Sequence, residues 1–252
     1  MRSKNPFLKR FESQTSAVNN SEIITDFSNT MTSEGVINKS LILLSILLGT
    51  SILSWYLTSL SLINPMVLTF GGGIIGFILV LIASFKPQHA KILAPGYALF
   101  EGLFIGGVSA FFEAMYPGIV VKAVGATFVT FIVCFLLYKY RIVKVTERFK
   151  SVVIGATLAI FSFYLISFVL SLFMSSFTPI HHGNSLLSIG ISVGVVIIAA
   201  LNLFLDFEQI ETGVAKRYPK FMEWFSAMGL LITLVWLYIE ILRLLAKLAS
   251  RD

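Results

Sequence analysis

Seven apolar segments, each about 20 residues long, follow one another along this chain from residue 40 onward. A helix needs about that length to cross the hydrocarbon core of a bilayer, where backbone groups must hydrogen-bond to one another. We therefore predict an all-α integral membrane protein, a bundle of seven transmembrane helices joined by short loops. The predicted spans are Ser40–Leu60, Pro65–Phe85, Ile92–Phe112, Ile119–Tyr138, Val152–Phe173, Leu186–Leu205 and Met228–Leu248.

The composition excludes a soluble domain. Of the 252 residues, 56% are hydrophobic and 13% are charged, whereas a soluble domain carries about 25% charged residues. The net charge of +6 comes mainly from basic residues in short loops, which is typical of cytoplasmic loops. We therefore expect the lipid bilayer, and not nucleic acid, as a partner. The single cysteine, Cys134, excludes a disulfide framework within one chain.

Two regions are predicted along the chain. Residues 1–35 are polar, and we expect them to form a flexible cytoplasmic tail, while residues 36–252 form the membrane domain. No apolar stretch precedes residue 40, so we expect the first span to act as an uncleaved anchor.

The distribution of Lys and Arg predicts the orientation. These residues gather in the tail and in the second, fourth and sixth loops, whereas the first and fifth loops carry none. The N-terminus is therefore expected in the cytoplasm and the protein in the cell (inner) membrane, with the C-terminus outside after seven crossings. Arg243, Lys247 and Arg251 make the last segment basic at its end, which leaves open a final helix that re-enters and returns.

Pairs of glycines four residues apart predict close helix packing, because two small residues on one face let helix backbones approach. Three spans carry such pairs: Gly72 and Gly76, Gly102 and Gly106, and Gly190 and Gly194.

Three acidic residues lie within or at the edge of apolar segments: Glu101, Asp206 and Glu240. A charged side chain at the bilayer centre costs at least about 2.5–3.5 kcal/mol, so such residues usually face a partner, a water-filled cavity or a pathway. Glu101 is about ten residues from either end of the third span. It is either a protonatable or cation-binding group inside the bundle, or a structural hydrogen-bonding group between helices.

Asp206 and Glu240 have different surroundings in the sequence. Gly213 is the next helix stop after Asp206, so the sixth span is expected to continue and to hold Asp206 about 10 Å from its end. Asn202 lies four residues before Asp206 on the same helix face. Glu240 shares a face with Arg243 and Lys247, so it either faces a central cavity or pairs with Arg243.

Signatures of common enzymes are absent: the sequence contains no HExxH, no GxSxG and no P-loop. We therefore expect no catalytic residues and no cofactor. A metal site at the adjacent His181 and His182 is disfavoured because neighbouring residues do not share a helix face. Hydrolysis by two carboxylates and a water is the weakest alternative.

The segments Leu205-Asp206-Phe207-Glu208-Gln209-Ile210-Glu211 and Trp236-Leu237-Tyr238-Ile239-Glu240-Ile241-Leu242-Arg243 carry a family resemblance. They resemble the Bax inhibitor-1 family, the transmembrane Bax inhibitor motif-containing proteins, and in particular its bacterial members. Family members have an Asp followed by Gln and Ile at the end of helix six, and a second acidic residue in the final helix. The resemblance spans about residues 36–248, and Glu101-Gly102 is similar to an acidic-Gly pair in helix three of many members.

The resemblance implies seven helices and a cation leak, chiefly for calcium, that is gated by a carboxylate pair and sensitive to pH. On this basis Asp206 and Glu240 form the gate and Glu101 lines the route. Arg243 and Asn202, which neighbour the two gate residues in the sequence, are candidate modulators of the gate. We expect the last helix to lie near the centre of the bundle. The alternative is a regulator without transport activity that binds a membrane-bound AAA protease or another membrane partner.

Three features of this chain depart from the family pattern. Glu240 stands where members usually have Asp, and Arg243 stands where they often have Asn. The distance along the chain from Asp206 to Glu240 is longer than usual, because a Pro219–Ala227 segment intervenes. We expect that segment to form a short interfacial helix before the last span.

Overall fold

The computed structural model describes residues 29–60, 63–173, 183 and 185–251. It divides into a unit Met1–Thr30 and a unit Met31–Asp252, and every helix discussed below belongs to the second unit. Most of the predicted tail and the pair His181–His182 lie outside the described residues.

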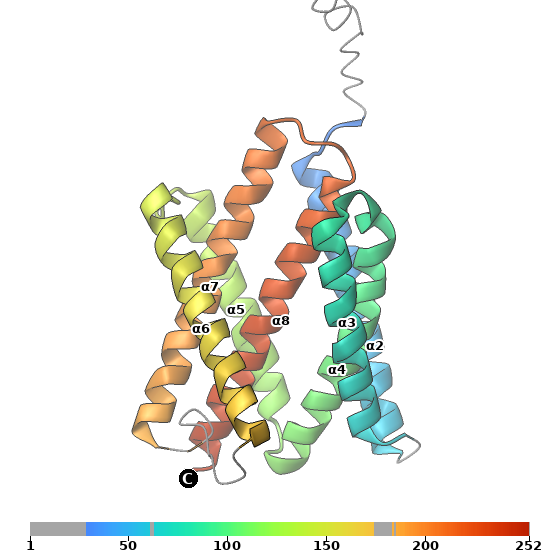
Figure 1. Cartoon of the computed structure of the whole chain (residues 1–252), viewed down its shortest axis with the longest axis vertical. Coiled ribbons are helices and arrows are strands. Elements are labelled where there is room, and N and C mark those ends of the chain that lie inside the picture. The colour runs from blue at the N-terminus through green and yellow to red at the C-terminus, as the bar shows by residue number, and fades with distance from the viewer. Residues whose placement is uncertain (1–28, 61–62, 174–182, 184, 252) are drawn as a thin grey trace, which may run out of the picture. The chain divides into compact units, whose positions relative to one another are not determined.

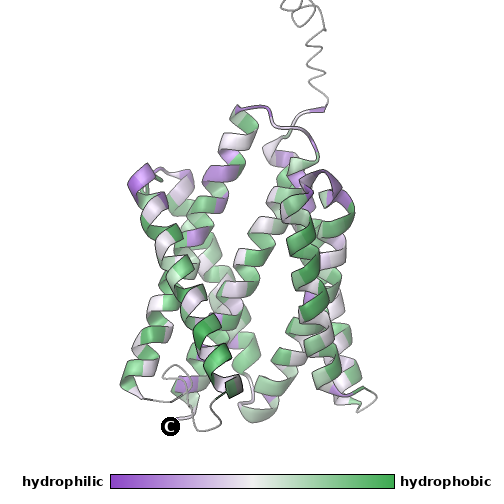
Figure 2. Ribbon diagram, viewed as in Figure 1, coloured by the Kyte–Doolittle hydropathy of each residue, from purple (hydrophilic) through white to green (hydrophobic). Residues whose placement is uncertain are grey.

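In the part of the chain that the structure describes, seven helices are long and apolar enough to cross a membrane, which confirms the predicted fold class. Each helix contains most or all of one predicted span, and four of them extend five to ten residues beyond it at one end. A short 3-10 turn η2 (Pro87–His89) precedes α4. The helices are α2 (Ser33–Ser59), α3 (Pro65–Phe85), α4 (Ala90–Met115), α5 (Ile119–Lys139), α6 (Glu147–Phe173), α7 (Leu186–Ala215) and α8 (Met222–Ala249). Hydrophilic residues gather at the helix ends, and the middle of each helix is mostly hydrophobic (Figure 2).

The last helix is the core of this unit, as predicted. α8 packs against α2, α4, α5 and α7, and Figure 1 shows it running between the α2–α3–α4 group and the α5–α6–α7 group. Among the 18 most apolar consecutive residues of α8, 67% are buried, whereas the corresponding stretches of the other spans are 11–39% buried. The six outer helices therefore present apolar side chains to the surrounding bilayer, and α8 is largely shielded from it.

Polar groups close several helix ends. Thr32, Asn64 and Ser185 each accept a hydrogen bond from a backbone N–H of the first turn of α2, α3 and α7. Glu113 of α4 accepts hydrogen bonds from the backbone N–H groups of Gly118 (2.6 Å) and Val120 (3.1 Å), so its carboxylate caps the start of α5. These contacts satisfy backbone donors that would otherwise be unpaired at the membrane boundary.

Two helices are longer than predicted at the ends that face the sixth loop. α7 continues from Leu205 to Ala215, so the expected continuation past Asp206 is confirmed. α8 begins at Met222, so most of the predicted interfacial segment Pro219–Ala227 is the first part of α8 and not a separate helix. That prediction was wrong because the segment's apolar residues pack on the core, where Ala227 is fully buried.

Two of the three glycine pairs lie at helix contacts. An added Cβ would collide with backbone atoms of α2 at Gly102 and Gly106, and with backbone atoms of α4 at Gly72. At Gly76 it would approach only the Glu101 carboxylate closely, and at Gly190 and Gly194 no atom of the described residues lies within 4 Å. The prediction of close packing is therefore confirmed on α3 and α4 and wrong on α7.

Candidate functional site

Glu240 is one of the most buried side chains of the protein, although it is acidic. The residue is 1% exposed, and Tyr164 of α6 donates from its hydroxyl to the carboxylate, with both oxygens at 3.3 Å. Arg243 lies one turn further along α8 and pairs with Glu240 at 3.2 Å, while 46% of the Arg243 side chain is exposed. Its guanidinium also lies over the Tyr164 ring, 5.7 Å from the ring centroid. The charge of Glu240 is therefore balanced by a neighbouring cation that can reach solvent or headgroups.

Lys247 lies two turns beyond Glu240 on the same face of α8. Its ammonium group donates to the hydroxyls of Ser192 (2.7 Å) and Ser188 (2.9 Å) on α7. Two hydroxyls on successive turns of α7 thus hold this lysine between the helices.

Asp206 of α7 lies nine residues, or about 14 Å, from the end of its helix. The Thr233 hydroxyl of α8, which donates to the Gly229 carbonyl at 3.3 Å, lies beside its carboxyl group. The Oδ2 atom of Asp206 is buried and has no hydrogen-bond partner among the described residues. A buried carboxyl oxygen without a donor is costly in a folded protein, and such groups often mark a site for a ligand, an ion or water.

These contacts form a regular pattern, which we call the polar ladder. Thr233, Glu240 and Lys247 recur every seven residues on one face of α8, about 10 Å apart along the helix. Each meets a polar side chain of α6 or α7: Asp206, Tyr164, and Ser188 with Ser192. The ladder therefore places polar groups at three levels along the most buried helix.

The structure does not bring Asp206 and Glu240 together. Asp206 is at the level of Thr233, which precedes Glu240 by seven residues, or about 10 Å along α8. Glu240 instead has Arg243 and Tyr164 as partners. The two carboxyl groups occupy neighbouring levels of the ladder, and Arg243 holds Glu240 as the sequence alternative anticipated.

Glu101 lies elsewhere, at the contact between α3 and α4. A Cβ atom added to Gly76 of α3 would lie 2.9 Å from the Oε2 atom of Glu101, so the absence of a side chain at Gly76 leaves space for the Glu101 carboxyl group. Glu101 therefore lies beside α3, whereas Asp206 and Glu240 have their polar neighbours on α6 and α8. Asn202 donates to the Thr157 hydroxyl of α6 (2.9 Å) and to the Ile198 carbonyl (2.8 Å), both away from Asp206.

Sequence reasoning missed a buried ion pair between the first and last helices. Glu223 is 1% exposed, and it accepts hydrogen bonds from the Thr32 backbone N–H and the Thr32 hydroxyl, each at 3.0 Å. Lys39 of α2 forms an ion pair with it, and a Cβ at Gly35 would collide with the same carboxylate. We call this group the α2–α8 clasp. Its sequence signal was weak, because Glu223 stands in a stretch of alternating charges that suggests a solvated surface.

A second cluster at the C-terminal end of α7 holds its acidic residues. Tyr138 of α5 donates to Glu208 (3.1 Å) and to Glu211, and Arg141 pairs with Glu211. The hydrogen bond to the Glu211 carboxylate raises the pKa of Arg141 above its ordinary value. These partners explain how α7 continues as a helix through an acidic stretch.

Comparison with known proteins agrees with this architecture. The family described as Bax inhibitor 1 like matches residues 5–250, nearly the whole chain. No curated protein matches the sequence significantly. Seven apolar helices, a buried last helix and a match over almost the full length show that the chain belongs to the Bax inhibitor 1-like family of membrane proteins.

Proposed function

We propose that this protein is a pH-sensitive cation leak, with calcium as the leading substrate, and that ions pass along the polar ladder. The observation that carries the proposal is the buried Asp206 Oδ2 atom, an acceptor without a donor on the face of α7 that meets α8. Carboxyl and hydroxyl oxygens are the ligands that hard cations prefer. Asp206 and Thr233 supply such oxygens at one level of the ladder, and Glu240 supplies them at the next.

Arg243 gives this pathway a gate. Its guanidinium occupies the position beside Glu240 where a passing cation would interact, and it is held there by the negative charge of Glu240. Loss of that charge, as in Glu240→Gln, should release Arg243 and weaken the α6–α8 contact through Tyr164. The pH sensitivity is the part of the proposal that the family resemblance implies, and it is measured as the change in flux between pH 5 and pH 8. In this proposal the gate is the Glu240–Arg243 pair, with Asp206 as a separate binding level.

The test is calcium flux into proteoliposomes between pH 5 and pH 8. Glu240→Gln removes the charge that holds Arg243 and should leak at every pH, whereas Asp206→Asn should reduce flux about tenfold, the cost of losing roughly 1.4 kcal/mol of ion binding. Glu147→Gln is the matched control, because its side chain is 88% exposed and lies outside the ladder. The proposal fails if both ladder variants behave like the parent throughout this pH range.

The alternative, a regulator that binds a membrane-bound AAA protease, has one structural observation in its favour. The α2–α8 clasp ties Thr32, near the end of the predicted tail, and Lys39 to the start of the most buried helix. A partner that captures the tail would therefore act on α8. Deletion of residues 1–28 separates the two functions: a regulator should lose its partner in pull-down assays, and a leak should keep its flux.

A further inference from the structure

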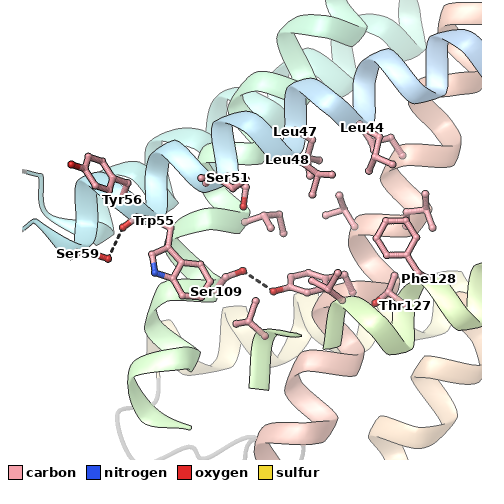
Figure 3. A pocket seen from close by; sticks show the side chains of 18 residues that line it. Leu44, Leu47, Leu48, Ser51, Trp55, Tyr56, Ser59, Ser109, Thr127 and Phe128 are labelled. Carbon is pink, nitrogen blue, oxygen red and sulfur yellow. Dashed lines mark hydrogen bonds between the residues drawn. The ribbon is translucent and has the colours of Figure 1, made fainter. Parts of the chain in front are cut away.

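An apolar cavity of about 580 Å³ lies between α2 and α5, on the side of α8 that faces away from the polar ladder. Figure 3 shows Leu44, Leu47 and Leu48 near one end and Trp55, Tyr56 and Ser59 at the other. Leu231 and Tyr238 of α8 line it, and each lies two residues before a ladder residue, about 200° around the helix. We call this cavity the α2–α5 groove.

The groove opens to the bilayer. Its lining residues Leu48, Ile52 and Phe128 are 40–70% exposed, so an apolar molecule in the membrane can reach the floor directly. A second cavity of about 570 Å³ shares Leu44 and Phe128 with it and continues along α2 and α5. The opening is therefore a lengthwise slot in the side of the helix bundle and not a closed void.

The length and the opening of the groove fit a hydrocarbon chain. From Leu44 to Ser59 the groove follows 15 residues of α2, or about 22 Å, which exceeds the roughly 15 Å of one bilayer leaflet. Because the groove opens to the bilayer along this length, the lipid chains that surround the protein reach it directly.

The polar groups of the groove also fit a hydrocarbon chain. The Ser109 and Tyr238 hydroxyls are hydrogen-bonded to each other at 2.7 Å, the contact drawn in Figure 3, and Thr127 donates to the Ala123 carbonyl. These groups therefore need no donor or acceptor from a ligand. Trp55 and Tyr56 stand near the end of α2, where amphipathic rings usually lie at the level of the lipid headgroups.

We propose that the α2–α5 groove binds one acyl chain of a membrane phospholipid, with the glycerol and headgroup at the Trp55 end and the chain end near Leu44. The bound chain packs on α8 opposite the polar ladder. No Lys or Arg lines the groove, so the site recognises the chain and not the headgroup charge.

Fluorescence of Trp55 tests the site. The chain has three tryptophans, so Trp224→Phe and Trp236→Phe leave Trp55 as the only reporter. The full chain in detergent is titrated with phosphatidylcholine that carries bromine on its acyl chain. We expect saturable quenching that is complete at about one lipid per protein, with the same half-saturation for an anionic lipid that has the same chains.

Two variants on one helix separate the groove from general lipid contact. Val124→Phe fills the groove and should raise the half-saturating lipid concentration about tenfold. Val129→Phe places the same side chain on a 62% exposed position that lines neither cavity, and it should change nothing. If the Val124→Phe protein does not fold, Leu48→Phe replaces it in this test, because it narrows the groove from the α2 side.

Several outcomes would overturn the proposal. Quenching that rises linearly without saturation means ordinary lipid contact, and equal effects of Val124→Phe and Val129→Phe mean that the groove is not the site. Quenching by the anionic lipid alone means that the headgroup is recognised. Saturable quenching that appears only after deletion of residues 1–28 means that the tail occupies the groove. Saturable quenching that appears only when a cross-linkable dimer has been diluted to monomers means that a second copy occupies it.

Discussion

At the scale of single residues, this membrane protein places its charges in pairs and not in isolation. Glu223 has Lys39 and Thr32, Glu240 has Arg243 and Tyr164, and Glu113 has two backbone N–H groups. Pairing lowers the cost of a charge in a medium that solvates it poorly. Glu101 and Asp206 differ, because neither has an ion pair among the described residues. One oxygen of Asp206 is also buried without a donor there, and this is the reason to propose a functional role for it.

The α2–α8 clasp should be important for stability. Lys39→Met leaves the buried Glu223 carboxylate without its cation, which should lower the free energy of unfolding by about 3–5 kcal/mol. Lys150→Met is the control, since its partner Glu147 is 88% exposed and the pair contributes about 0–1 kcal/mol. Unfolding of both variants in mixed detergent measures the difference. Equal stability of the two variants would show that the clasp is not a buried pair in the membrane.

Arg243 should restrain the leak at neutral pH. Arg243→Leu removes the guanidinium beside Glu240, so we expect calcium flux at pH 8 to rise about tenfold and to vary less with pH. Arg251→Leu, in the last turn after α8, should leave flux unchanged. A pH profile of Arg243→Leu that matches the parent would remove Arg243 from the gate.

At the scale of helices, small residues decide which pairs approach closely. α4 meets α2 through Gly102 and Gly106, where an added Cβ would collide with backbone atoms of α2. α7 carries the same glycine spacing at Gly190 and Gly194, but open space faces it. The spacing alone cannot separate these cases, because it depends on which face of the helix meets a neighbour.

This difference predicts opposite results for the same substitution. Gly102→Ala and Gly106→Ala should each destabilise the protein by about 1–3 kcal/mol, because the helices must move apart. Gly190→Ala and Gly194→Ala should be neutral or slightly stabilising, since alanine favours the helix. Thermal unfolding of the four variants provides the measurement. A loss of stability at Gly190 similar to that at Gly102 would contradict the helix contacts described above.

The spans were predictable because hydropathy reports directly on contact with lipid. α3 begins and ends at the predicted residues, whereas α7 extends ten residues further than Leu205. The sequence did indicate that extension through the position of Gly213, but the partners of Glu208 and Glu211 on α5 were not visible in it. Only part of the polar ladder could be predicted from the sequence. The spacing identified Arg243 as a neighbour of Glu240, but hydropathy does not distinguish Tyr164 and Thr233 from the other residues of their spans.

At the scale of the whole membrane unit, the path of α8 supports a last helix that spans the membrane over one that re-enters and returns. α8 is a continuous 28-residue helix, longer than the roughly 20 residues that a crossing requires, and it contains no break where a re-entrant segment could turn. Its start and its end therefore lie at opposite ends of the helix bundle, as Figure 1 shows for α8.

Cysteine labelling can test this topology in cells. After Cys134→Ser, Ser250→Cys should react with a membrane-impermeant maleimide from outside, because it follows the end of α8. Lys216→Cys, between α7 and α8, should react only after the membrane is opened. Labelling of both positions from the same side would favour a helix that returns, and reversal of the two results would overturn the predicted cytoplasmic N-terminus.

The central place of α8 also has a consequence for biosynthesis. Lys39 enters the membrane with the first helix, but its partner Glu223 follows 184 residues later, about 10–40 s at ordinary rates of translation. During that interval the lysine must be accommodated by water, headgroups or the insertion machinery. The six earlier helices are also synthesised before α8, the helix on which most of them pack, so the core of the bundle cannot form until α8 follows. Closure of the α2–α8 clasp thus marks completion of the chain, and a truncated product lacks both its ion pair and its core.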